Sequence, residues 1–338
     1  MIGLCKLSFA LAALMALSFS AEAAPFKIIL PYLEPPPVPD SVIDLALRLG
    51  FYKEAGVEVE LMRVVQTPSA IAALRAGDGD MANVATGTSL EVVARDQMKL
   101  RAVASAGKAL PFIIATKKEI TTPKQLNGKS FGIASIGSTD YIVSRIVLGK
   151  LGVDLNSLQF VALGVPPVRA QALLAGRIDS TAFSIGVWMG LPDKSALNML
   201  VDQPSYFNAA PYLTQLDVVT EETAKKKATE VQAVVRAIIM ASRAFAEKPS
   251  LWVDAMMAAR PDLKRDDLAA VAETYRESWS VNGGINLDSV AFTTDTLYTD
   301  PAWKDLRKVP PKEWIDTHFI DKVLAEKGVV ASSDPTGR

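Results

Sequence analysis

The sequence is very poor in cysteine and histidine. Its 338 residues include one cysteine, Cys5, and one histidine, His318. A catalytic triad, a zinc site and an internal disulfide therefore lack the partners that they need. His318 stands beside Phe319 near the end of the chain, where a packed or surface role is the ordinary interpretation. We expect no enzyme activity, no cofactor, no metal and no catalytic residue. Acid–base catalysis by a pair of carboxylates is the alternative that the sequence leaves open.

The chain also lacks an excess of charge and the common nucleotide-binding motifs. It has 36 Lys and Arg residues against 37 Asp and Glu residues, mixed along its length. Nothing therefore favours a nucleic-acid partner or an anionic membrane surface. Gly128-Lys129-Ser130 ends like a phosphate-binding loop, but Pro123 stands where the first glycine is required. Asp78-Gly79-Asp80 begins like a calcium loop, but Ala82 occupies the next ligand position.

A long apolar run occurs near the start of the chain, and no later run is long enough to span a membrane. Lys6 precedes the run Leu7–Phe19, and Ala21-Glu22-Ala23 follows it. This order predicts a secretory signal peptide over residues 1–24, cleaved after Ala23 or Ala24, and thus a periplasmic protein that has lost Cys5. A buried N-terminal helix is the alternative. No later segment reaches about 18 uninterrupted apolar residues.

Strand and helix patterns alternate from Pro25 onward. Apolar runs predict strands at residues 26–30, 57–61 and 80–84, and periodic segments predict helices between them at 40–49 and 67–77. The same order recurs as strands at 130–134, 160–163 and 179–183, with helices at 137–151 and 166–175. Such alternation predicts an α/β fold with mostly parallel sheets flanked by helices.

The two units share sequence as well as order. Ala73-Leu74-Arg75-Ala76-Gly77 and Ala172-Leu173-Leu174-Ala175-Gly176 lie 99 residues apart, and Pro68 matches Pro167 at the same offset. Chance similarity of helix ends is the alternative. We predict two similar lobes, with residues 25–114 and 214–338 in the first and 115–213 in the second. The segment from Glu221 onward, including helices at 232–246 and 316–327, is a helical extension expected to pack on the first lobe.

Ligands of open parallel sheets bind beyond the carboxyl ends of the strands. Each predicted lobe has three loops there, and several begin helices whose free N–H groups favour an anionic group. Every hydroxyl in these loops also fits ordinary N-capping. Glu34 and Asp40 could instead meet an amino group, so the ligand's charge stays open. The candidate ligand-binding residues are Tyr32, Pro36, Thr67, Ser69, Thr86, Thr88, Ser135, Ser138, Thr139, Arg169, Ser184 and Trp188.

Larger side chains in these loops suggest further contacts. Arg169 could pair with a carboxylate or sulfonate, or be a solvated surface charge. Tyr32, Tyr141 and Trp188 could stack on a flat ligand, or pack in the core or at its rim. Pro35-Pro36-Pro37 would keep the first loop stiff, which lowers the entropy lost when it closes on a ligand.

Four segments resemble substrate-binding proteins of ABC importers of the nitrate, sulfonate and taurine (NitT/TauT) type. They are Leu49-Gly50-Phe51-Tyr52-Lys53-Glu54-Ala55-Gly56-Val57-Glu58-Val59-Glu60, Ala76-Gly77-Asp78-Gly79-Asp80, Pro123-Lys124-Gln125-Leu126-Asn127-Gly128-Lys129 and Leu173-Leu174-Ala175-Gly176-Arg177-Ile178-Asp179. The similarity runs from residue 26 to residue 300. The proline-rich first loop and Ala85-Thr86-Gly87-Thr88 match no one ligand subgroup.

The resemblance implies a type II periplasmic-binding-protein fold. It implies two hinge crossings, which we place near Ile114-Ala115 and Leu213–Val218. It also implies capture of a small organic molecule, as an anion such as a sulfonate or carboxylate, by lobe closure, and delivery by a monomer to an ABC permease in the cytoplasmic membrane. The alternatives are an enzyme on the same scaffold, for example in pyrimidine-precursor synthesis, and a periplasmic ligand sensor.

Overall fold

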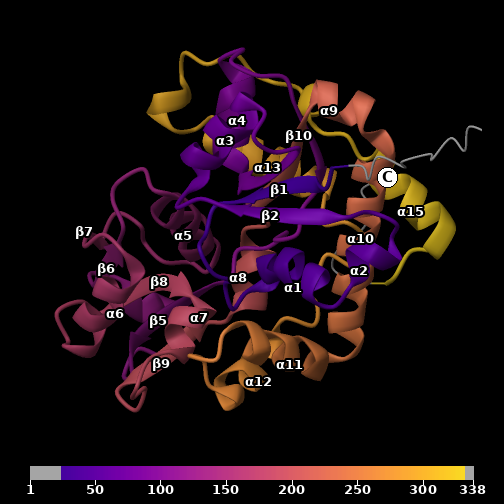
Figure 1. Cartoon of the computed structure of the whole chain (residues 1–338). Coiled ribbons are helices and arrows are strands. Elements are labelled where there is room, and N and C mark those ends of the chain that lie inside the picture. Colours follow the sequence, from indigo (N-terminus) through magenta and orange to yellow (C-terminus); the bar gives the residue numbers. More distant parts are fainter. Residues whose placement is uncertain (1–23, 332–338) are drawn as a thin grey trace, which may run out of the picture.

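Two five-stranded sheets organise the protein. The computed structural model describes residues 24–331, in which the strands form two separate sheets, A and B, flanked by helices (Figure 1). The predicted signal peptide, Cys5 included, lies outside the described residues apart from Ala24. The α/β class with two mostly parallel, helix-flanked sheets is confirmed. The exact domain boundaries stay a prediction.

Sheet A has the strand order β2-β1-β3-β10-β4. β1 pairs in parallel with β2 and β3, with Ile28 opposite Leu61 and Met81, whereas β10 runs antiparallel between β3 and β4. Helices cover the faces of such a sheet, and four of the five residues of β1 are accordingly apolar, Lys27 being the exception. The strands are β1 (Phe26–Leu30), β2 (Val59–Arg63), β3 (Met81–Ala85), β4 (Leu100–Ala104) and β10 (Gln215–Thr220).

Sheet B repeats this arrangement in the order β7-β6-β8-β5-β9. β6 pairs in parallel with β7 and β8, and β5 runs antiparallel between β8 and β9. In both sheets the antiparallel strand is the one that the chain enters on crossing from the other sheet. The common order confirms the predicted duplication. The strands are β5 (Phe112–Lys117), β6 (Ser130–Ile133), β7 (Gln159–Ala162), β8 (Ser180–Ser184) and β9 (Leu197–Val201).

We call sheet A with its helices the first lobe, and sheet B with its helices the second lobe. The helices between the strands of the first lobe are η1 (Pro39–Ser41), α1 (Val42–Arg48), α2 (Phe51–Glu54), α3 (Thr67–Ala76) and α4 (Thr86–Ala94). Those of the second lobe are η2 (Pro123–Leu126), α5 (Thr139–Lys150), α6 (Pro166–Leu174), α7 (Ile185–Met189) and α8 (Gln203–Ala209).

The remaining helices form the C-terminal extension. They are α9 (Glu221–Lys226), α10 (Ala228–Glu247), α11 (Pro249–Ala259), α12 (Arg265–Thr274), α13 (Leu287–Leu297), η3 (Pro301–Trp303), α14 (Pro311–Trp314) and α15 (His318–Lys327). Among residues 24–331, none of these or the earlier helices has the length and apolar character to cross a membrane.

The extension packs on the first lobe, as the sequence indicated. α10 contacts α1, α2 and α15, because its apolar residues repeat at helical spacing along one face. Trp252, Tyr275 and Trp279 pack edge to face beneath it, and the Trp252 indole N–H donates to Ser41 Oγ at 2.9 Å. This aromatic cluster joins the extension to the start of α1.

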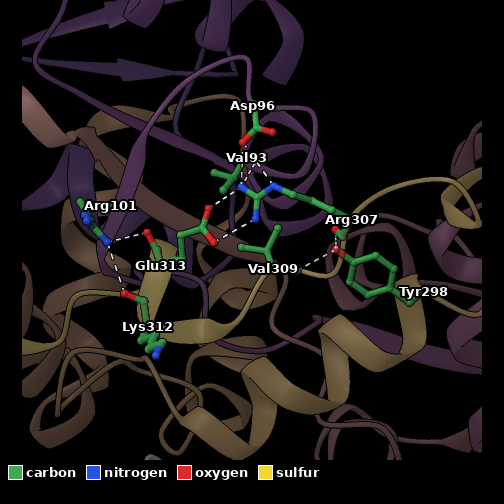
Figure 2. Close-up of polar contacts among 8 residues, drawn as sticks. All are labelled: Val93, Asp96, Arg101, Tyr298, Arg307, Val309, Lys312 and Glu313. Atoms are coloured by element: carbon green, nitrogen blue, oxygen red, sulfur yellow. Dashed lines mark hydrogen bonds and ion pairs between the residues drawn. The ribbon is translucent and has the colours of Figure 1, made fainter.

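A network around Arg307 fixes the segment between α13 and α15 (Figure 2). The Arg307 guanidinium donates to Asp96 Oδ1 at 2.9 Å and pairs with the Glu313 carboxylate. The Tyr298 hydroxyl donates to the Arg307 carbonyl at 2.6 Å, and Arg101 donates to the Glu313 carbonyl. Charge-assisted hydrogen bonds to one guanidinium therefore anchor the extension to the end of α4.

The chain passes between the lobes twice. The first crossing is residues 105–111, between β4 and β5, and the second is residues 210–214, between α8 and β10. The predicted crossing at Ile114-Ala115 is wrong, because both residues lie inside β5, paired on both sides. The crossing lies upstream, where small residues allow a close path. Of Leu213–Val218, Leu213 belongs to the second crossing and Val218 lies within β10.

The first crossing is held by the loop after α12. Ser105 N–H donates to the Gly283 carbonyl at 2.9 Å, and the Ser280 hydroxyl donates to the Ser105 carbonyl. Gly284 has a φ of +78°, and a Cβ there would lie 2.0 Å from Ser105 O. Both the backbone conformation and the space therefore require glycine at this position.

Replacing Gly284 should loosen the crossing far more than replacing another left-handed glycine. We expect Gly284→Ala to lower the free energy of unfolding by about 3 kcal/mol or more, because strain adds to a backbone clash. Gly56→Ala is the matched control, since Gly56 has a φ of +89° and open space around it. It should cost about 1 kcal/mol. Urea unfolding measures both, and equal losses would contradict the close packing inferred here.

Candidate functional site

Loops and helices at the facing ends of the two sheets lie in contact. The carboxyl ends of β1, β3 and β4 and the start of β10 form one edge, and the equivalent ends in sheet B form the other. A Cβ at Gly186 would lie 3.6 Å from Pro37 Cγ, and the Ser278 hydroxyl donates to Gln203 Oε1 at 3.1 Å. α7 of the second lobe also packs against α12 of the extension (Figure 1). The lobes are thus closed on each other.

The N-termini of α4 and α5, one from each lobe, meet at the second crossing. Thr86 N–H at the start of α4 donates to the Thr214 carbonyl at 3.0 Å. The Tyr212 hydroxyl neighbours the side chain of Thr139, the first residue of α5, and lies 4.0 Å from a Cβ at Gly87. We call Thr86, Thr139, Tyr212, Thr214 and Gln215 the polar site. Its members bring two helix dipoles to one place.

The polar site holds unused hydrogen-bonding groups. Neither α4 nor α5 has a side-chain hydrogen bond at its N-cap. Thr86 Oγ1, Thr214 Oγ1 and Gln215 Oε1 are buried without a partner, and Thr86 is 1% exposed. A buried polar group without a partner costs free energy, so such atoms suggest a missing ligand or water. The two threonine hydroxyls can donate to the oxygens of an anion, together with backbone N–H groups at the helix N-termini, whereas Gln215 Oε1 is an acceptor.

Two buried carboxyl groups lie beside the first crossing. Asp217 of β10 accepts hydrogen bonds from Asn83 Nδ2 at 2.8 Å and from Ala106 N at 2.9 Å. Asp40 Oδ1 is buried without a hydrogen bond, and a Cβ at Gly107 would lie 2.2 Å from it. We call Asp40 and Asp217 the carboxyl pair.

Burial raises the pKa of both members of the carboxyl pair. The pKa of Asp40 rises to about 7, first because burial penalises the charged form and then because Asp217 lies near. Burial raises the pKa of Asp217 to about 6, against the opposing effect of the hydrogen bonds from Asn83 and Ala106. Asp40 is therefore the member that is more readily neutral.

The predicted hydroxyl residues of the second lobe divide into two groups. Thr139 belongs to the polar site. The Ser138 hydroxyl is used locally, since it donates to the Ser135 carbonyl at 2.6 Å. Ser135 itself is exposed. Ser184 Oγ accepts from Val187 N–H and caps α7. Ser184 thus acts as an N-cap, and the Ser138 hydroxyl stabilises a local turn.

The predicted residues of the first lobe are also separated by the structure. Thr86 belongs to the polar site, and Thr88 lies half-buried in the same helical turn. Thr67 and Ser69 begin α3, which follows β2 at the outer edge of sheet A, two strands away from β3. Pro36 lies half-buried in the first loop, one residue before the Pro37 contact.

Arg169 is buried in the second lobe rather than placed at its surface. It is 2% exposed, donates to the Ala182 carbonyl at 3.0 Å and lies 3.5 Å from Asp140. Burial lowers the pKa of its guanidinium, and Asp140 opposes that shift. A solvated surface charge therefore does not describe it, and its contact with a ligand stays a prediction. Its side chain positions the start of α5 through Asp140.

The other large side chains named from the sequence also have partners in the protein. The Tyr32 hydroxyl donates to Asp44 at 2.9 Å, and Trp188 is 9% exposed within the core. Glu34 pairs with Arg260 at 3.1 Å. Core packing therefore accounts for Trp188, whereas Tyr32 and Tyr141 are half-buried.

Sequence reasoning placed the second crossing near Leu213–Val218 but did not recognise β10 or the polar residues at its start. Tyr212, Thr214, Gln215 and Asp217 were not candidates, because β10 was not recognised as a strand. One sign was available: Asp217 interrupts an otherwise apolar, β-branched run, and a charged residue there needs a buried partner. Within residues 24–331, no cluster of three or more His, Cys, Asp or Glu side chains is placed to hold a metal ion.

Known proteins resemble this chain in sequence and in fold. The family described as NMT1/THI5 like matches residues 42–251. The taurine-binding periplasmic protein of Escherichia coli is 26% identical over 208 residues, which are 60% of this chain and 62% of that protein, less than two thirds of its length. The aliphatic sulphonate binding protein SsuA of Escherichia coli superposes with a TM-score of 0.68 at 15% identity, covering 86% of this chain and 92% of its own.

An enzyme shares the fold too. The desulfurization enzyme DSZB superposes with a TM-score of 0.63 at 14% identity, covering 89% of this chain and 99% of its own. At this level of identity both solved structures establish the fold alone.

Replacing Asp40 of the carboxyl pair should change how the free energy of unfolding depends on pH. The folded-state pKa of Asp40 is raised to about 7, so its contribution to stability is complete below the unfolded pKa of about 4 and is lost as pH rises through 7. Asp40→Asn cannot ionise. Between pH 5 and pH 8 we expect the wild type to lose about 1 kcal/mol or more of unfolding free energy relative to the variant. Parallel urea unfolding curves with the same slope against pH would contradict this.

Proposed function

We propose that this chain, which belongs to the NMT1/THI5-like family, is a solute-binding protein of the NitT/TauT type that captures a small organic sulfonate or carboxylate between its lobes. The observation that carries this proposal is the hydroxyl of Thr86, which is buried without a hydrogen-bond partner. It lies at the N-terminus of α4, which has no side-chain cap and faces the similarly uncapped N-terminus of α5 in the other lobe. The names of the taurine-binding and sulphonate-binding relatives support the choice of anion.

The polar site suits such an anion chemically. Ligand oxygens would accept hydrogen bonds from the Thr86 hydroxyl and from backbone N–H groups in the first turns of α4 and α5. The positive ends of two helix dipoles would add to these hydrogen bonds. Because the Thr86 side chain is buried and already in place, little is lost in ordering its hydroxyl on binding.

Hinge closure follows from where the polar site lies. Thr86 belongs to the first lobe and Thr139 to the second, and the second crossing runs between them. An anion that contacts both helix N-termini binds the closed arrangement better than the open one, and therefore shifts the population toward it. We further propose that the protein acts in the periplasm as a monomer and presents its closed form to an ABC permease.

The alternatives fit the polar site less well. Desulfurization by the fold neighbour is a property of that protein, and the polar site here gathers hydroxyl and amide groups, which suit binding. A sensor would use the same ligand site and differ in its membrane partner. Co-purification with a permease, in place of a kinase, separates transport from sensing.

Removing one hydroxyl should separate ligand affinity from stability. We expect titration calorimetry with taurine, methanesulfonate or benzoate to detect binding, and Thr86→Val to weaken it by about tenfold through loss of one hydrogen bond. The ligand-free variant should be as stable as the wild type, because the hydroxyl has no partner to lose.

Thr116→Val is the matched control for this experiment. Its hydroxyl is buried in the second lobe and donates to the Ile120 carbonyl at 2.9 Å. This variant should lose about 1 kcal/mol of stability and keep its affinity. An unchanged affinity in Thr86→Val would remove the polar site from the proposal.

Small-angle scattering tests lobe closure. A chain of this length should have a radius of gyration of roughly 20 Å when compact. Saturating ligand should reduce the measured radius by about 1 Å if the free protein samples an open state. Thr86→Val at the same ligand concentration should stay closer to the ligand-free value. Identical scattering with and without ligand in the wild type would count against hinge closure.

A further inference from the structure

A second hollow lies along the outer face of α5. It is an open groove of about 970 Å³, with α5 of the second lobe as one wall and α13 and η3 of the extension as the other. Its main apolar lining residues are Tyr141, Ile142, Ile146, Leu155 and Phe292. The groove is therefore made by both lobes.

The groove exists because α5 is apolar on two faces. Val143 and Val147 point into the core of the second lobe and are buried. Ile142 and Ile146 follow the same helical spacing one residue earlier and are left half-buried. A surface helix normally carries one apolar stripe. The second stripe on α5 therefore needs an explanation beyond the packing of sheet B.

The cations of the groove lie over aromatic rings. The Arg145 guanidinium lies 5.4 Å from the ring centroid of Tyr141 and 5.6 Å from that of Phe160. The Lys150 ammonium lies 5.8 Å from the ring centroid of Phe292. These contacts hold both charged side chains against the walls. The stretch around Ile142 and Ile146 stays available for an apolar group.

The groove starts beside the polar site on both lobes. Just before α5, Gly137 lines the groove two residues ahead of Thr139, whose side chain neighbours the Tyr212 hydroxyl. On α13, Thr296 lines the groove, and the next residue, Leu297, lies 3.4 Å from a Cβ at Gly87 of α4. Each wall of the groove thus adjoins one of the two helix N-termini that meet at the polar site.

From this continuity we infer that the groove is the subsite for the organic group of the captured anion. The ligand class is a sulfonate or carboxylate that carries an aromatic or branched-alkyl group, with its charged oxygens at the polar site and its apolar part between α5 and α13. The volume of about 970 Å³ lies at the upper end of the range for sites that hold drug-sized ligands. A two-carbon ligand would leave the groove empty. The inference rests on the proposed function.

Two sulfonates that differ only in the organic group provide the test. We expect wild-type protein to bind naphthalene-2-sulfonate about tenfold more tightly than methanesulfonate by titration calorimetry, because the ring system has far more apolar surface to bury than one methyl group. Ile146→Gln makes the groove polar, and Ile146→Trp fills it. Both should remove most of the difference while leaving methanesulfonate affinity unchanged, which also shows that the variants are folded.

Leu151→Gln is the matched control. Leu151 follows α5, is 37% exposed and does not line the groove. This variant should keep the wild-type preference for naphthalene-2-sulfonate. An equally large loss in Leu151→Gln would mean a general effect on α5 and would overturn the inference.

The remaining outcomes separate the groove from the polar site. If both Ile146 variants keep the full preference for naphthalene-2-sulfonate, the groove is not the subsite. The proposed function still stands in that case, provided that methanesulfonate binding is weakened by Thr86→Val. If naphthalene-2-sulfonate binds Thr86→Val as tightly as wild type, it binds elsewhere and the inference fails. If neither sulfonate binds the wild type, the choice of sulfonate and the subsite fail together.

Discussion

The junction of the two lobes depends on one buried carboxyl group. Asp217 lies on β10, the strand that returns from the second lobe, and binds Ala106 on the segment that leaves the first. Its other partner, Asn83, lies on the neighbouring strand β3. Without Asp217 both partners would be buried and unpaired, at a cost in stability. The bases of the two crossings are thus tied together, and opening must occur in the residues beyond them.

The sequence predicted well those elements whose signals are local. Both α3 and α6 begin next to a proline and end at a left-handed glycine, Gly77 or Gly176, and both were placed almost to the residue. β4, β5, β9 and β10 were not recognised. β5 and β10 are buried on both faces, so they show no alternation, and their place is decided by partner strands far along the chain. The first crossing was misplaced for the same reason.

The candidate site shows the same division. Hydroxyl residues at helix N-termini could be listed from the sequence, but only tertiary contacts distinguish Thr86, whose hydroxyl is left without a partner, from Ser138 and Ser184, whose hydroxyls are used within a turn. Arg169 is the opposite case. Its surroundings in the sequence resemble a loop, yet Asp140 and two carbonyl groups hold it inside the second lobe. Local propensity carries no information about such a partner.

The carboxyl pair sets an electrostatic condition on any anion held at the polar site. Gln215 lies two residues before Asp217 on β10, a separation of about 7 Å along the strand. Two ionised carboxylates so near would oppose a sulfonate or carboxylate. Burial reduces this repulsion, because a pKa of about 7 keeps Asp40 partly protonated at neutral pH. A bound anion would raise that pKa further, and by linkage a protonated Asp40 would strengthen binding of the anion. The carboxyl pair can therefore coexist with an anion site, because Asp40 is partly protonated, and affinity for the anion should increase as the pH falls.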